Sequence, residues 1–356
     1  MRCFILSLFI LGVLLGRTGP AAHAQEKIEA VWNTSLNHFF DNREYNNTIN
    51  WSQTLFGLRL APEIGLRFDH FYSIMVGMNF LANYGDRPAI KATDYIAYFQ
   101  YQGNKFNCYA GLIPRSKSIG GYAYAFFSDS INYYVPNLSG MLLQYRGKSG
   151  YAEFGIDWKS MITNSEREKF LLFHSSRINI RSFYAGLQAS MYHHGTTHLD
   201  DELVDNILLY PHIGVDLAAA TRFDLFDVRV GWMQAFQNDR TYVGKYVTPG
   251  GFQFDLQLEK WRFGIINTLY TGQNLMPYWE VPNLRLYYRS DLYWGEPFYR
   301  SDSVYDRLEL YWQPRIGNRL QLRISSVHHY CGHQWGGWQQ KVNLIVNLGV
   351  HRLTKP

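Results

Sequence analysis

The chain has few cysteines and, beyond its first residues, no long apolar run. Of its three cysteines, Cys3 lies in the leader described below, and Cys108 and Cys331 are far apart in the sequence. We interpret these two as isolated thiols, because the strands expected around them place them at opposite ends of the molecule. After the leader, no segment supplies the roughly 18 consecutive apolar residues that a membrane helix needs. The sequence therefore favours neither a disulfide-held fold nor a helical membrane protein.

The chain also lacks an excess of charge of either sign. Its formal net charge is +5, and removal of Arg2 and Arg17 with the leader lowers it to +3. We therefore expect no nucleic-acid partner. Zinc-finger, phosphate-cradling and dinucleotide motifs are missing, so no cofactor is expected. No low-complexity linker divides the chain, which predicts one domain over residues 25–356.

The first 24 residues have the pattern of a secretory signal peptide. Arg2 precedes an apolar stretch over residues 4–15, and a small-residue site, Ala22-His23-Ala24, follows. This pattern predicts cleavage after Ala24 and export of the remaining residues.

The last long segment, residues 338–350, alternates strictly between two kinds of side chain. One face is apolar apart from Gln340, and the other is mostly polar: Trp338, Gln340, Val342, Leu344, Val346, Leu348 and Val350 against Gln339, Lys341, Asn343, Ile345, Asn347 and Gly349. Such alternation is typical of a strand with two different surroundings. In an exported, aromatic-rich chain it favours a closed membrane barrel with an apolar outside and a wet inside.

The same pattern recurs along the whole chain. Strands are expected over residues 28–40, 56–68, 71–83, 93–101, 105–113, 141–145, 152–158, two within 169–194 with a turn near 176–179, 207–220, 226–236, 252–258, 261–270, 304–313, 320–330 and 338–350. Short and long connections alternate between them. This predicts an all-β, antiparallel up-and-down barrel of about 16 strands, with 14 to 18 acceptable because residues 284–289 could hold another pair. Pro62 would fit such a wall only at a bulge.

These alternating strands resemble the general porin-like class of Gram-negative outer-membrane barrels. The resemblance implies a location in the outer membrane, with long outer loops, short periplasmic turns, and contact with outer-membrane lipid and the barrel-assembly machinery. The chain departs from that class at its end, because residues 351–356 follow the last strand and no terminal aromatic residue is present. The number of subunits is not readable from the pattern.

Charged residues on the inward face are candidates for the lining of a pore. They are Arg59, Glu63, Arg67, Glu153, Asp157, Arg229, Asp255, Arg262, Arg307, Glu309 and Arg323, and Glu259 belongs to the same face. Opposed rows of charge would give weak solute selectivity. The alternative is that they pair across neighbouring strands and only hydrate the interior.

The connection from Pro114 to Asn137 is the third outer loop in this count. In the porins that the chain resembles, the third loop folds inward and constricts the pore. The resemblance makes Arg115, Lys117 and Asp129 candidates for that constriction. The alternative is an outer cap held together by the aromatic residues of the same loop.

Two further clusters suggest other chemistry. The spacing H-H-x-x-x-H occurs twice, which makes His194 with His198, and His329 with His333, alternative metal ligands. Ser326 and His328 share the outward face of one strand, as do the serine and histidine of barrel hydrolases that cleave outer-membrane lipids, although those use the order H-x-S.

We therefore predict a channel that passes small hydrophilic solutes by diffusion, and no enzyme activity. The alternatives are an outer-membrane lipid hydrolase and a structural or surface-binding barrel plugged by its own loops.

Overall fold

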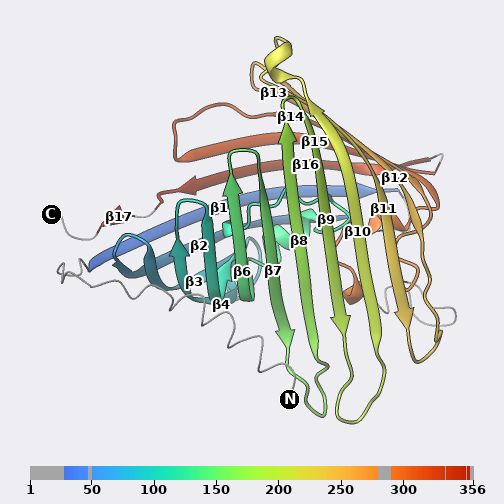
Figure 1. Cartoon of the computed structure of the whole chain (residues 1–356), viewed down its shortest axis with the longest axis horizontal. Helices are drawn as coiled ribbons and strands as arrows, with labels where there is room; N and C mark the ends of the chain where they lie inside the picture. Colours follow the sequence, from blue (N-terminus) through green and yellow to red (C-terminus); the bar gives the residue numbers. More distant parts are fainter. Residues whose placement is uncertain (1–27, 47–49, 280–289, 333, 350, 353–356) are drawn as a thin grey trace.

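The chain folds into a closed antiparallel barrel (Figure 1). This computed structural model describes residues 28–46, 50–279, 290–332, 334–349 and 351–352. Its strands are β1 Glu29–Tyr45, β2 Gln53–Phe68, β3 Tyr72–Asn83, β4 Ile90–Gln102, β5 Phe106–Pro114, β6 Asn137–Gly147, β7 Gly150–Ser160, β8 Lys169–Ile180, β9 Phe183–His194, β10 Val204–Asp216, β11 Leu225–Asp239, β12 Gly250–Lys260, β13 Phe263–Gly272, β14 Ser303–Trp312, β15 Leu320–Cys331, β16 Gln334–Asn347 and β17 His351–Arg352. From β1 to β16, each strand pairs with its neighbour in the sequence, and β16 closes the barrel against β1.

The expectation of about 16 strands is confirmed, since the barrel has 16 and β17 is a two-residue extension beside β1. The turn expected near residues 176–179 is wrong. Residues 181–182 form that turn, because Ile180 pairs with Phe183 and the polar residues before it still belong to the wall. The strand pair considered within residues 284–289 lies outside the described residues.

Pro62 fits into the wall without the expected bulge. The register between β2 and β3 is unbroken, but Leu60 pairs with Phe80 and the next partners are Glu63 and Gly77. The ladder thus skips the position of the proline, whose missing N–H is not needed there.

The two ends of the barrel differ in the length of their connections. At one end, short turns such as residues 148–149 and 261–262 join the strands, and β1 begins and β16 ends there. Most connections at the other end are long. The exception is between Cys331 and Gln334, where two residues suffice because both strands extend farther than the sequence indicated. Cys108 and Cys331 are both free thiols.

The helices are short and lie in the connections. They are η1 Arg115–Lys117, α2 Asp129–Tyr134, η2 Ala218–Ala220, η3 Ser290–Leu292 and η4 Pro297–Arg300. Among the described residues, no helix has the length and hydropathy to cross a membrane.

Two of the long connections fold into the barrel and build its core. Residues 115–136, which we call the first inner loop, supply Phe126 to a buried aromatic cluster. The described residues between β13 and β14, 273–279 and 290–302, which we call the second inner loop, supply Phe298 and Tyr299 to the same cluster. Tyr133 of α2 stacks on Phe39 of β1, with 4.4 Å between ring centroids. Because side chains of the loops pack against the inner wall, the interior is a filled core over much of its section.

Candidate functional site

The first inner loop is fastened to the wall by two acidic residues of β7. Asp157 pairs with Arg115 at 2.9 Å and with Lys159 at 2.5 Å. Glu153 is fully buried and accepts hydrogen bonds from the backbone N–H of Ile119 (2.6 Å) and Gly120 (3.1 Å). Carboxylates that accept several N–H groups fix a backbone in place. These two wall residues therefore set where the loop enters the lumen.

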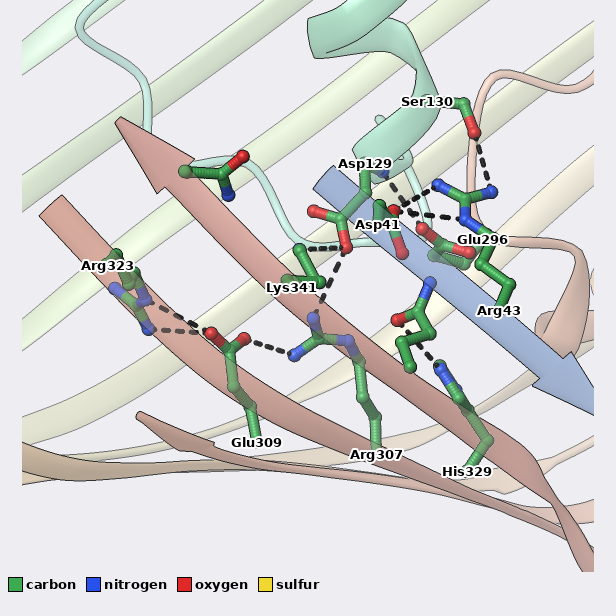
Figure 2. Close-up of polar contacts among 12 residues, drawn as sticks. Asp41, Arg43, Asp129, Ser130, Glu296, Arg307, Glu309, Arg323, His329 and Lys341 are labelled. Atoms are coloured by element: carbon green, nitrogen blue, oxygen red, sulfur yellow. Dashed lines mark hydrogen bonds and ion pairs between the residues drawn. The ribbon is translucent and has the colours of Figure 1, made fainter. Parts of the chain in front are cut away.

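Near the other end of this loop, across the lumen, Asp129 of α2 belongs to a buried ion cluster (Figure 2). The carboxylate of Asp129 lies 2.6 Å from Nζ of Lys341 on β16 and 3.4 Å from Arg307 on β14. Arg307 also pairs with Glu309 at 2.9 Å, and Glu309 with Arg323 at 2.9 Å. Burial alone raises the pKa of Asp129, but Lys341 and Arg307 outweigh burial and hold it well below its usual range. The cluster is therefore an ionised network that joins the loop to the wall.

The second inner loop joins the same cluster through Glu296. Its Oε1 accepts the backbone N–H of Asp129 at 2.9 Å, and its own N–H donates to the carbonyl of Tyr124 at 2.8 Å. Burial, and after it the charge of Asp129, raises the pKa of Glu296. The N–H of Ser128 donates to the carbonyl of Trp294 at 2.8 Å. The two inner loops are thus bonded to each other through their backbones.

Apart from Arg262, the remaining wall charges expected from the sequence lie on the inner side. Arg59 bonds Asp94 (3.1 Å) and Asn79 (2.7 Å), and Glu63 accepts from Asn33 (2.8 Å) and Tyr98 (2.9 Å). Arg229 pairs with Asp255 at 2.9 Å. Arg67 is partly buried near the short-turn end. The expectation that Arg262 lies on the inner face of a strand is wrong: it lies in the turn between β12 and β13, with a left-handed backbone and a pair with Glu259 at 3.7 Å.

Two cavities remain beside the inner loops. One has a volume of about 360 Å³ and is lined by residues that include Asn37, Arg59 and Lys341. The other has a volume of about 440 Å³ and is lined by residues that include Arg177, His212 and Asp255. Lys117 is not among the residues that line either cavity; its ammonium lies 5.6 Å from the ring of Tyr98. The void between the second loop and the wall measures only about 30 Å³, which is room for one water.

The structure separates the histidines that were considered as metal ligands. His194 on β9 lies 3.4 Å from Asp291, whereas His329 on β15 is bonded to Tyr305 (3.0 Å) and Gln339 (3.1 Å). His198 is exposed in a loop, and His333 lies outside the described residues. In the described part of the chain, no three potential ligands converge on one point.

Ser326 and His328 meet on the outside of the barrel. Ser326 Oγ lies 3.0 Å from Nε2 of His328, and the indole N–H of Trp338 donates to the same oxygen at 2.7 Å. The rings of His328 and Trp338 are nearly parallel, at 7° and 6.2 Å between centroids. Because the serine oxygen already accepts from tryptophan, its own hydrogen is free to point at the histidine nitrogen. This is the arrangement that activates a serine as a nucleophile.

This pair lies where the outer wall changes from apolar to polar. Ile324 on β15 and Val342 on β16 are the last apolar residues before it, and Gln340 lies directly opposite Ser326 in the ladder. Asn42 of β1 donates to Gln340 at 3.3 Å and continues the polar surface. A boundary of this kind marks the level where hydrocarbon meets headgroups.

The sequence reasoning missed three residues of these sites. Lys341 was visible as a lone cation in the alternation of the last strand. Glu296 carried no local signal, because its role depends on a contact with Asp129, 167 positions away in the chain. The role of Trp338 depends on its contact with Ser326 on the neighbouring strand, which only the register of the two strands reveals.

Comparison with known proteins identifies a family and an architecture. A family model described as lipid A 3'-O-deacylase-type matches residues 25–329. No curated protein matches the chain. The chain is similar to the solved structure of OmpTdeltaL8, a loop L8 deletion mutant of an outer membrane protein of Vibrio cholerae, with a TM-score of 0.54 and 8% identity over 90% of this chain and 99% of that one.

A second similar structure is an anion-selective porin from Comamonas acidovorans, with a TM-score of 0.50 and 11% identity over 92% of this chain and 100% of that one. Identities this low bear on the fold alone. They confirm the porin-like barrel expected from the sequence. In outer-membrane barrels of this architecture, the short-turn end is periplasmic and the long loops face outward.

Proposed function

Because the chain belongs to the lipid A 3'-O-deacylase-type family, we propose that this outer-membrane barrel hydrolyses an ester between a fatty acyl chain and the sugar headgroup of an outer-leaflet lipid. The observation that carries the proposal is the hydrogen bond of 3.0 Å between Ser326 and His328 on the lipid-facing wall. An ester of such a lipid lies at the junction of acyl chains and headgroup, which is the level of this pair.

The proposed reaction proceeds through an acyl-enzyme. His328 Nε2 takes the proton of Ser326, and the serine oxygen attacks the ester carbonyl. The bond between the carbonyl carbon and the sugar oxygen then breaks, and His328 returns the proton to that oxygen. A water molecule, deprotonated by the same histidine, cleaves the acyl-serine and releases the fatty acid.

Two neighbours support this chemistry. The indole N–H of Trp338 donates to the serine oxygen, and its ring stacks on the imidazole of His328. In this proposal Trp338 takes the place of the carboxylate that orients the histidine in other serine hydrolases. Gln340 offers its carbonyl to Asn42, so its amide hydrogens are free to donate to the oxyanion that forms beside Ser326.

The test is acyl-chain release from lipid A by the purified protein, followed by mass spectrometry. Ser326→Ala is expected to lower the rate on the order of a thousandfold or more. The matched control is Ser325→Ala, because Ser325 is adjacent but buried on the inner face. Full activity in Ser326→Ala, or equal loss in both variants, would contradict the proposal.

Solute diffusion, the function expected from the sequence, is a second candidate. It is favoured by the two cavities of about 360 and 440 Å³ inside the barrel, because charged side chains such as Arg59 and Asp255 are part of their linings. Steady ionic current through single molecules in a planar bilayer supports it, and a protein that cleaves lipid without any current excludes it.

A further inference from the structure

The periplasmic turns carry a set of exposed cations that neither proposed function uses. They are Lys105, Arg146, Lys148, Arg181, Arg222, Arg315 and Arg319. Exposed acids on the same turns are few: Asp69, and Asp224, which accepts the backbone N–H of Trp261 at 3.0 Å. The rim therefore carries a local excess of positive charge although the whole chain is nearly neutral. We call these seven residues the periplasmic cation ring.

The cations of this ring have no ionic partner within the protein as far as the structure describes it. In the lumen, by contrast, Arg115, Arg307 and Lys341 are each bonded to a carboxylate at 3.4 Å or less. Unpaired surface cations contribute little to the stability of a fold. The ring is therefore available to an anion outside the chain.

Large apolar side chains lie on the outside of the barrel beside the ring. Phe106 and Phe183 are 60% and 67% exposed, and Phe263 is 63% exposed. Trp261, at the tip of its turn, is 79% exposed, and Nζ of Lys260 lies 5.7 Å from its ring. Aromatic residues of this kind mark the level of the membrane interface. The cations lie just beyond them, which is the level of the lipid phosphates.

We propose that the periplasmic cation ring binds the phosphates of anionic phospholipids in the inner leaflet of the outer membrane. The cations occur on five different turns, those after β4, β6, β8, β10 and β14, and so they are spread along much of the rim. A single protein partner would cover one sector of the rim, whereas a lipid annulus meets every turn. The proposal is independent of the lipid hydrolysis proposed above.

The experiment compares lipid selectivity in reconstituted bilayers. The wild-type protein is placed in mixtures of phosphatidylglycerol and phosphatidylcholine, one of which is brominated, and quenching of tryptophan fluorescence is measured. Trp261→Phe identifies the part of the signal that comes from the rim. Wild type is expected to prefer phosphatidylglycerol several-fold, and the preference should vanish at high salt.

The test variant is Lys105→Gln/Lys148→Gln/Arg319→Gln. At a lipid site that loses one cation, the preference should fall about fivefold, the equivalent of roughly 1 kcal/mol. The matched control is Arg87→Gln/Lys91→Gln/Lys245→Gln, which removes three exposed cations from the outer loops and should keep the preference.

Heat-dependent gel mobility checks that both variants form barrels. Equal quenching by the two lipids in wild type overturns the proposal, as does an equal change in both variants. A triple variant that loses binding to an acidic polypeptide but keeps its lipid preference also overturns it, and assigns the ring to a protein partner.

Discussion

At the scale of single residues, the outward face of β15 and β16 shows how a strand can hold reactive groups. Residues two apart on one strand lie on the same face, so Ser326 and His328 face the lipid together. Trp338 comes from the next strand and reaches both of them. In this arrangement the ladder itself sets the distance between the proposed nucleophile and the proposed base.

Trp338 is a positioning residue in the proposed hydrolysis, which leads to a prediction at this scale. Trp338→Phe keeps the stacking on His328 and removes the N–H bond to Ser326. One hydrogen bond is worth about 0.5–1.5 kcal/mol, so kcat for acyl release should fall up to about tenfold with KM little changed. Trp338→Leu should lower it further, because the histidine ring loses its stacking. A Trp338→Leu variant with wild-type kcat would remove tryptophan from the mechanism.

Lys341 supports a second prediction at the same scale. Lys341→Met keeps the length of the side chain but leaves the buried carboxylate of Asp129 with Arg307 alone. Removal of one partner from a buried ion pair costs about 3–5 kcal/mol. The double change Lys341→Met/Asp129→Leu should recover most of this loss, measured by urea unfolding in detergent. A single variant as stable as wild type would show that the pair contributes little.

At the scale of elements, the first inner loop is held by two carboxyl groups whose pKa values are shifted in opposite directions. The lowered pKa of Asp129 means that its contribution to loop attachment is complete above about pH 3.8, its usual value, and is lost as pH falls through the lower folded value. Glu296 acts in the opposite sense, because its pKa in the folded protein is raised. Its protonated carboxyl contributes stability at low pH, and this contribution is lost as the pH rises through the pKa of the folded state.

The corresponding prediction concerns cleavage of residues 115–136 by an acid-active protease. Cleavage of wild type should rise steeply below about pH 3.8, the usual pKa of the Asp129 carboxyl. Asp129→Asn should be cleaved readily at every acidic pH and show no such step. The barrel strands, whose hydrogen bonds do not titrate, provide the internal control through their resistance. A wild-type loop that stays uncut at the lowest pH would contradict the role of Asp129.

At the scale of the whole molecule, the barrel and its contents are held by different forces. The wall is a continuous ladder from β1 to β16 and back, whereas the inner loops are attached by ion pairs and aromatic packing. We predict that Asp129→Ala/Lys341→Ala keeps the β-sheet circular dichroism of wild type but passes a larger ionic current in planar bilayers. Equal currents in the two proteins would show that the first inner loop stays in place without this pair.

The strand pattern by itself determined the barrel and its strand number. Such features follow from a two-residue period, which is local and survives errors of a few residues at the boundaries. The sequence did not predict the turn at residues 181–182. The polar residues before it belong to the wall, but a polar stretch is also typical of a turn when its neighbours in space are unknown.

Only the tertiary structure decided what fills the barrel and which residues meet. Asp129 reaches Lys341 across 212 positions of the chain, and Glu296 reaches Asp129 across 167. Periodicity carries no information about such contacts, because they depend on how two irregular loops turn inside a closed wall. The same holds for the surroundings of Ser326. The alternation of its strand predicted that Ser326 faces outward. The indole of Trp338, which donates to it, belongs to another strand, and only the register of β15 against β16 brings the two residues together.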